Sequence, residues 1–196
     1  YEPGWYYGRG GTAAPVNEDG TPVYYTVPES FEAAKNDGER WRWALAQVVE
    51  FDAGQLNAVR WELAQFCQSQ FGEQTLADYG WWFGRPFEEG KQDESGTYAL
   101  HTLSDDETIA RLATGIKRFT LPDEFNYLKI FKQIAAEPRT GLADQARDAI
   151  ARVYENRRQY PKAAEAWRQA IAEHGPGVNN YRQQALEQIT GNWGRF

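Results

Sequence analysis

Few residues of this chain have the types and spacing that catalysis or metal binding requires. Its only histidines are His101 and His174, which lie far apart in the sequence, and neither lies near the single cysteine, Cys67. A zinc site needs clustered Cys and His ligands, and triad hydrolysis needs a nucleophile paired with a histidine. The sequence therefore predicts no metal ion, no cofactor and no enzymatic activity.

The remaining reactive motifs have simpler interpretations. Residues 8–11 (GRGG) lack the Lys-Ser/Thr ending of a phosphate-binding loop, and no helix is predicted after them. The acidic pair Glu88-Glu89 is interpreted as part of a solvated loop, and Asp105-Asp106 as part of a helix cap. We therefore expect no catalytic carboxylates among them.

One short motif matches a known covalent site without its reactive residue. Gly72-Glu73-Gln74 matches the end of the Cys-Gly-Glu-Gln thioester motif, but Phe71 stands where the cysteine would be. No internal thioester can form in this arrangement.

The single cysteine, Cys67, lies on an apolar helical face, so we expect a buried thiol that does not react in the native protein.

The densest aromatic segment spans residues 79–87 and includes Tyr79, Trp81 and Trp82. Two interpretations stay open. The rings could hold a loop against the helices, or they could form an exposed shelf for a carbohydrate or a peptide, because aromatic rings are large, rigid contact surfaces.

Composition narrows the classes of partner. The chain has 196 residues, enough for one large domain, and a net charge of −7, which argues against binding to nucleic acid or to an anionic membrane. No apolar run approaches the roughly 20 residues that a membrane span needs, so we predict no membrane insertion. The chain begins at Tyr1 and contains no methionine, so we expect a piece of a longer protein.

The first half of the chain predicts an irregular arm followed by helices. Residues 1–29 are rich in Gly, Pro and aromatic residues and are expected to lie as an extended arm or small hairpin on the helices. Ser30 is a candidate N-cap for a short helix through Asn36, and helical spacing predicts further helices over 39–51 and 55–71.

The second half is also predicted to be helical. Ser104 and Glu107 have the spacing of a capping box, which predicts a helix through Phe119. A second helix is predicted from Leu121 through Ala135, because proline is tolerated in a first turn. Residues 181–189 predict a last helix, and residues 191–196 are expected to begin a following segment.

The clearest pattern covers residues 144–177, where two short amphipathic helices are joined by a tight turn. Its small and aromatic residues resemble those of a tetratricopeptide repeat, a helix-turn-helix unit of about 34 residues that stacks with neighbours into a protein-binding surface. Two departures are Arg158, where the family favours glycine, and Gly175-Pro176 at the helix end. The residues that carry the resemblance are Ala151, Tyr154, Tyr160, Ala163, Trp167 and Ala170.

The chain also resembles the N-terminal helical region of large bacterial alpha-2-macroglobulin family proteins of the planctomycete type. The strings that suggest this are SFEAAK (30–35), GERWRWAL (38–45), QFG (70–72) and GNWGRF (191–196). The resemblance implies an interaction or scaffold segment of an extracytoplasmic protein, with an extracytoplasmic location favoured over the cytoplasm. The family's covalent trapping chemistry is not implied, because its thioester cysteine is replaced by Phe71.

Together these patterns predict an all-α fold: antiparallel helix pairs over residues 30–190 form a short, right-handed superhelix like that of tetratricopeptide repeats, with the aromatic arm packed on it. The leading hypothesis is a non-catalytic module that binds a protein or peptide. The alternatives are a structural spacer in a larger protein and the aromatic site of residues 79–82. The sequence specifies neither the partner nor the oligomeric state.

The predicted binding face lies on the first helix of the clear repeat and on the helix that comes after the repeat. Arg152 and Arg182 could together grip a carboxylate of an acidic or C-terminal peptide. Alternatively, both arginines simply pair with Asp148 and Glu155. The predicted partner-binding residues are Gln145, Asp148, Arg152, Glu155, Asn156 and Arg182.

Overall fold

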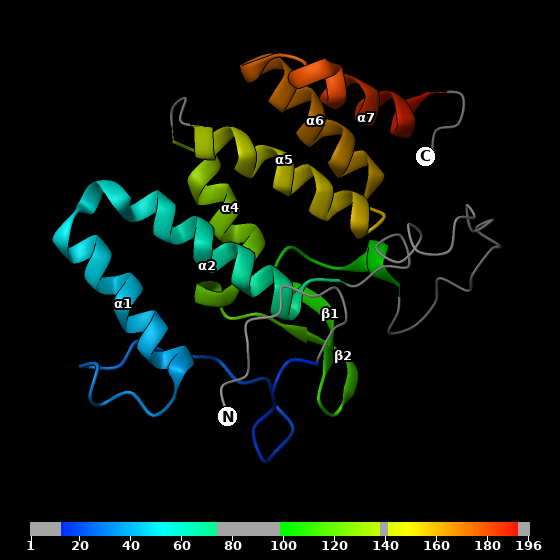
Figure 1. Ribbon diagram of the computed structural model, residues 1–196. Coiled ribbons are helices and arrows are strands. Elements are labelled where there is room, and N and C mark those ends of the chain that lie inside the picture. Colours follow the sequence, from blue (N-terminus) through cyan, green and yellow to red (C-terminus); the bar gives the residue numbers. More distant parts are fainter. Residues whose placement is uncertain (1–12, 74–98, 138–140, 192–196) are drawn as a thin grey trace.

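The computed structural model describes residues 13–73, 99–137 and 141–191, and in these ranges the fold consists mostly of helices, with one small antiparallel β-hairpin at their edge (Figure 1). The prediction of a mostly helical fold is confirmed, and the all-α class holds roughly, because the described residues add only a small two-stranded sheet to the helices. The helices and strands are α1 (Asp37–Phe51), α2 (Leu56–Phe71), β1 (Glu107–Leu112), β2 (Gly115–Thr120), α4 (Tyr127–Ala135), α5 (Gly141–Asn156), α6 (Tyr160–His174) and α7 (Tyr181–Thr190). Short 3-10 helices span Ala53–Gln55, Leu100–Thr102, Asp123–Phe125 and Val178–Asn180.

Helices α4 to α7 pack consecutively, each against the next, with α5 between α4 and α6 (Figure 1). Small residues are buried in both helices of the α5–α6 pair: Ala151 of α5 and Ala163 and Ala170 of α6 are fully buried, and Trp167 of α6 is 1% exposed. Small side chains let helix backbones approach closely. The predicted helical hairpin is therefore present, whereas a right-handed superhelix of repeats stays a prediction.

In the turn between α5 and α6, one residue has a left-handed backbone conformation at the position where tetratricopeptide repeats favour glycine. Arg158 stands there with φ 55°, and the amide of Gln159 donates to the carbonyl oxygen of Tyr154 at 2.8 Å. A side chain in this conformation is uncommon but tolerated at a helix end. The departure from glycine at Arg158 therefore does not prevent the turn.

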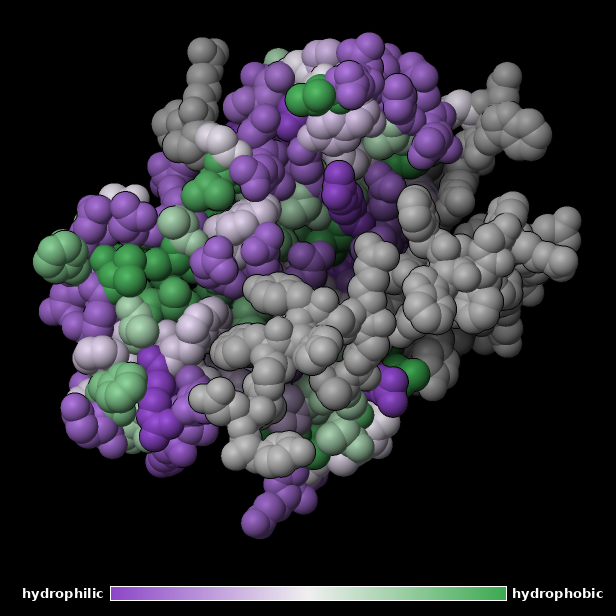
Figure 2. Space-filling model, viewed as in Figure 1, coloured by the Kyte–Doolittle hydropathy of each residue, from purple (hydrophilic) through white to green (hydrophobic). Residues whose placement is uncertain are grey.

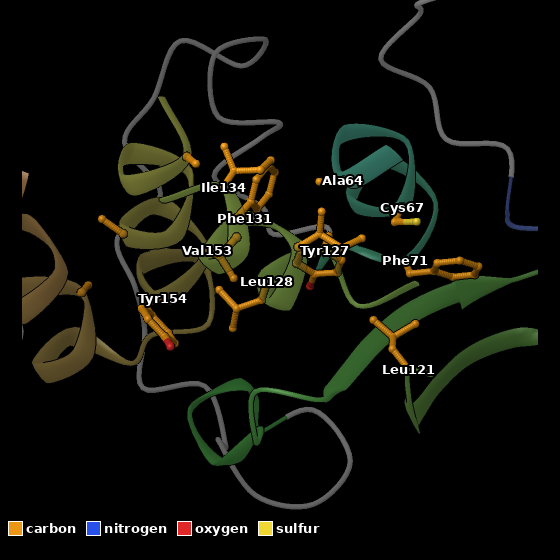
Figure 3. Close-up of a cluster of buried hydrophobic side chains, with 14 of the residues drawn as sticks. Ala64, Cys67, Phe71, Leu121, Tyr127, Leu128, Phe131, Ile134, Val153 and Tyr154 are labelled. Carbon is orange, nitrogen blue, oxygen red and sulfur yellow. The ribbon is translucent and has the colours of Figure 1, made fainter. Parts of the chain in front are cut away.

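Helix α4 lies at the centre of the hydrophobic core. Figure 3 shows Tyr127, Leu128 and Phe131 of α4 between side chains of α2 and α5. Cys67 of α2 belongs to this core with no exposed surface, and burial raises the pKa of its thiol to about 12. The predicted burial of Cys67 is confirmed, and its lack of reactivity stays a prediction.

The helix predicted from Ser104 to Phe119 is wrong, since this segment forms the β1–β2 hairpin. The strands pair from Glu107 with Thr120 to Leu112 with Gly115. The capping-box contact is made, with the amide of Ser104 donating to Glu107 at 3.0 Å, but a strand comes after it. Three contacts stabilise the strand instead, one across the hairpin and two with distant parts of the chain. These are an Arg118–Glu107 ion pair across the hairpin, a hydrogen bond from Thr108 Oγ1 to the carbonyl oxygen of Phe71, and pairing of Ala14 with β1.

Two predicted helix starts are also wrong. The short helix after Ser30 is a turn in which the Ser30 hydroxyl accepts a hydrogen bond from the amide of Ala33, and α1 begins only after its own cap, Asn36. Helix α4 begins after Asn126 rather than at Leu121, because the Asn126 side chain accepts from an amide in the first turn and only a 3-10 turn precedes it. In both cases an asparagine side chain caps the helix that forms.

The described part of the arm, residues 13–29, lies against β1 and against core side chains. Residues 17–21 form a tight loop closed by the bridge between Val16 and Pro22. The ring of Tyr24 lies 5.5 Å from that of Phe71 and 4.7 Å from that of Phe125, which anchors the arm to the core. Residues 1–12 lie outside the described part of the chain.

Candidate functional site

The predicted binding face of α5 is partly occupied by contacts within the protein. Arg182 of α7 is 2% exposed, and its guanidinium group bonds Asp148 at 2.8 Å and Asp144 at 2.6 Å. The hydroxyl of Tyr181 also donates to Asp148. Arg182 therefore pairs with Asp148, as the alternative hypothesis for this residue states, and this ion-pair cluster fastens α7 to α5.

The other predicted residues of this face differ in their exposure and contacts. Glu155 accepts a hydrogen bond from the indole nitrogen of Trp167, and Asn156 is half-buried at the end of α5. Gln145 and Arg152 are exposed. Of the two arginines predicted to bind a carboxylate together, Arg182 is buried and Arg152 is exposed. Its role as a binding residue stays a prediction.

The aromatic site of Tyr79, Trp81 and Trp82 lies outside the described residues.

A different stripe of α5 forms the floor of a groove. Arg147, Ile150 and Tyr154 succeed one another at spacings of three and four residues, which places them on one side of the helix, away from Gln145 and Arg152. Helices α4 and α6 form the two walls, and the groove encloses about 700 Å³. The residues that line it are Lys132, Ala135, Ala136, Arg147, Ile150, Tyr154, Pro161, Lys162, Glu165, Ala166 and Gln169.

One end of this groove concentrates charge. The ammonium groups of Lys132 and Lys162 lie 2.6 Å and 3.0 Å from the two carboxylate oxygens of Asp105, which belongs to the loop before β1. The hydroxyl of Tyr154 donates to the same carboxylate at 3.1 Å. Partial burial acts to raise the pKa of Asp105, but hydrogen bonds from the two lysines outweigh it and lower that pKa to about 2. The carboxylate is therefore ionised at neutral pH.

The other end of the groove is formed by Arg147. Its Nε lies 2.8 Å from a carboxylate oxygen of Glu173, and Nη2 donates to the carbonyl oxygen of Ala135 at 2.6 Å. The Nη1 atom is buried and makes no hydrogen bond. Arg147 thus holds the ends of α4 and α6 against α5.

A second polar cluster is buried between the N-terminal and C-terminal halves. Arg157 Nε lies 2.7 Å from Glu73 Oε1, and the hydroxyl of Tyr127 lies 3.0 Å from each Glu73 oxygen and accepts from Arg157 Nη2 at 2.9 Å. Burial raises the pKa of Glu73, although the charge of Arg157 opposes this shift. All three side chains are more than nine-tenths buried, so the cluster fastens the end of α2 to α4 and α5 and offers no open site.

Among the described residues no group of three or more metal-binding side chains is present, and none of the helices is long and apolar enough to cross a membrane. His101 and His174 lie on different elements, a 3-10 turn and the end of α6. The arrangement that the structure does offer is a groove with an apolar floor and charged ends, which is suited to non-covalent binding.

Sequence patterns alone do not reveal the residues of the groove. Lys132, Tyr154 and Lys162 come from three helices, and Asp105 comes from a loop where the sequence predicts a helix cap. The only local signal is the spacing of Arg147, Ile150 and Tyr154, which is equally typical of a helix-packing face. Comparisons of the chain with protein-family models, curated proteins and solved structures gave no match.

Proposed function

We propose that this chain is a non-catalytic module that binds a protein or peptide segment in the groove between α4, α5 and α6. The observation that carries the proposal is the groove itself, about 700 Å³ in volume and bounded by three helices. Its volume falls in the range of about 300 to 1,000 Å³ typical of ligand pockets. Grooves between helices are a recurrent mode of peptide recognition.

The lining of the groove favours a peptide with both apolar and polar side chains. Ala135, Ile150 and Ala166 give an apolar floor and walls that can take up an apolar side chain. Gln169, Glu165 and the lysines give a polar rim. An apolar centre with a polar rim is the usual anatomy of a protein interface.

The test is a selection of peptides from a random displayed library on the intact chain, followed by measurement of Kd by fluorescence anisotropy. The variant Ala136→Trp places a large ring in the groove from an exposed wall position. The matched control, Ala44→Trp, makes the same change at an exposed position of α1. We expect Ala136→Trp to weaken binding more than tenfold and Ala44→Trp to leave it unchanged. Selected peptides that bind both variants equally well would show that the groove is not the binding site.

A structural spacer is the second candidate, because apolar side chains are exposed where α1 meets α2. Phe51 is 95% exposed, and Val48 and Leu56 are also exposed. Figure 2 shows the green, hydrophobic surface over this hairpin at the left of the view. If these side chains contact another part of a larger assembly, the isolated chain should self-associate at high concentration, and Phe51→Ser should reduce the association measured by light scattering.

A further inference from the structure

The charged end of the groove is arranged around a carboxylate. Three donors that line the groove converge on Asp105: the ammonium groups of Lys132 and Lys162 and the hydroxyl of Tyr154. The two ammonium groups also lie 5.7 Å and 5.3 Å from the centre of the Tyr154 ring, so cation–π contacts hold them in place. These donors come from α4, α6 and α5 respectively.

The Asp105 carboxylate is not required to hold its own loop in position. The loop backbone is fastened by other groups: Asn126 Nδ2 donates to the carbonyl oxygen of Asp105 at 3.0 Å, and Arg157 Nη1 donates to that of Ser104 at 3.0 Å. The amide of Leu121 donates to the carbonyl oxygen of Asp106 at 2.7 Å. The Asp105 carboxylate can therefore give up one or both of its ion pairs with the lysines while these backbone hydrogen bonds keep the loop in place.

The lysines also retain capacity for a second carboxylate. Each ammonium group has three donors, and one donor of each is directed at Asp105. Their side chains are 44% and 50% exposed at the groove. Two cations against one carboxylate leave a local excess of positive charge at this end.

We infer that the groove recognises an acidic side chain, an Asp or Glu within a peptide segment whose neighbouring residues are apolar, through Lys132, Lys162 and Tyr154. This inference rests on the proposed function and names the class of peptide bound. We commit to an internal acidic side chain because Asp105, which already occupies these donors, is itself one. The apolar floor at Ile150 and Ala166 then takes up an adjacent apolar side chain.

The net charge of the chain does not prevent this recognition. The negative charges that make up the net charge of −7 would repel an acidic ligand from a distance. At physiological ionic strength this repulsion is largely screened for exposed charges farther apart than about 8 Å. At contact distance the two lysines dominate. Binding should therefore weaken as salt concentration rises.

The experiment uses peptides obtained from the displayed library, with each acidic residue replaced by Asn or Gln in a matched peptide. Against the wild-type protein, replacement of the recognised residue should weaken binding about tenfold. The double variant Lys132→Gln/Lys162→Gln should cause a similar loss, whereas Lys129→Gln, an exposed position of α4 outside the groove lining, should change Kd less than twofold. Asp105→Asn should tighten binding about threefold, the size expected for one exposed charge interaction.

The two proposals fail in different ways. One outcome is that Ala136→Trp weakens peptide binding, whereas neither replacement of the peptide's acidic residues nor the lysine variants change Kd. This outcome would overturn the acidic-ligand inference and leave the groove as the binding site. Peptides that bind Ala136→Trp as well as wild type would overturn the proposed function. Thermal melts of each variant establish that it is folded, and the matched-peptide comparison needs no protein variant.

Discussion

The helical hairpin α5–α6 and the β-hairpin β1–β2 are both antiparallel pairs joined by short turns, yet the sequence predicts only the first. In α5–α6 the residues that decide the structure lie within the hairpin: Ala151 and Ala163 are fully buried at the contact, and Trp167 fills the space beside it. In β1–β2 the decisive partners lie far away in the chain, at Ala14 and Phe71. A local pattern therefore predicts structure reliably only where the stabilising contacts are themselves local.

The capping box at Ser104 illustrates the difference. Its characteristic hydrogen bond, from the amide of Ser104 to the Glu107 side chain, is present in the structure. The same bond can precede a helix or a strand, because it fixes the conformation of one turn and leaves the next residues free to be helical or extended. Beyond the turn, the β-branched Thr108 and Ile109 pair with Phe119 and Arg118 of β2, and Leu112 at the far end of β1 pairs with Ala14.

The largest effect is expected from removal of the central aromatic ring of the helical hairpin. Trp167→Ala should reduce the free energy of unfolding by about 3–5 kcal/mol, because the buried ring leaves a cavity between α6 and Tyr181, whose ring centre is 6.2 Å away. Denaturant unfolding monitored by circular dichroism measures the loss. Trp43→Ala, at a half-buried position of α1, is the matched control and should cost less than half as much. Equal losses would show that the helical hairpin is not the more tightly packed region.

Overpacking the same contact should have a smaller effect. Ala163 has no exposed surface where α6 meets α5, so Ala163→Leu should destabilise the protein by about 1–3 kcal/mol. Ala44→Leu, at an exposed position of α1, should be neutral. A thermal melt in which Ala163→Leu matches wild type would contradict close packing between the two helices.

The effect of Gly115→Ala on the free energy of unfolding has opposite signs for a β-hairpin and for a helix over residues 104–119. Gly115 has φ 114° in the β-hairpin, so Gly115→Ala should destabilise the protein by about 1 kcal/mol through backbone strain. In the helix predicted from sequence, the same change would stabilise by about 1 kcal/mol. Gly141→Ala is the control, since a Cβ there meets no neighbour within 4 Å and φ is not positive. A stabilised Gly115→Ala variant would restore the helical interpretation.

The helices α1, α2, α6 and α7 are predictable from sequence to within a few residues from helical spacing, although the only buried side chain of α1 is that of Arg42 and not of an apolar residue. The groove is not predictable in this way. Lys132, Tyr154 and Lys162 are brought together only by the packing of three helices, and Asp105 reaches them from a loop whose structure the sequence misassigns. The contacts of the α5 face chosen from sequence also depend on packing, since Arg182 of α7 pairs with Asp144 and Asp148 there.

The smallest expected effect tests whether a single ion pair across the strands contributes to the β-hairpin. Arg118 Nη2 lies 2.8 Å from Glu107 Oε2, and hydrogen bonds from Arg118 and from the amide of Ser104 lower the pKa of Glu107 to about 2. A carboxylate whose pKa is lower in the folded state stabilises the protein above its unfolded pKa, near 4.5, and this contribution is lost as pH falls toward 2. Because the pair is partly exposed, Glu107→Gln should cost only about 0.5–1 kcal/mol at pH 7.

The pH dependence distinguishes this charge effect from a loss of packing. Urea unfolding of wild type and Glu107→Gln at pH 7, 4 and 2 should show a difference in free energy of unfolding that shrinks with acidification and is smallest at pH 2, where the folded carboxylate is partly protonated. Asp105, which titrates in the same range, is present in both proteins and cancels from the comparison. A difference that persists unchanged at pH 2 would mean that the glutamine disturbs the Ser104 turn itself. The β-hairpin would then depend, like the helical hairpin, on local contacts.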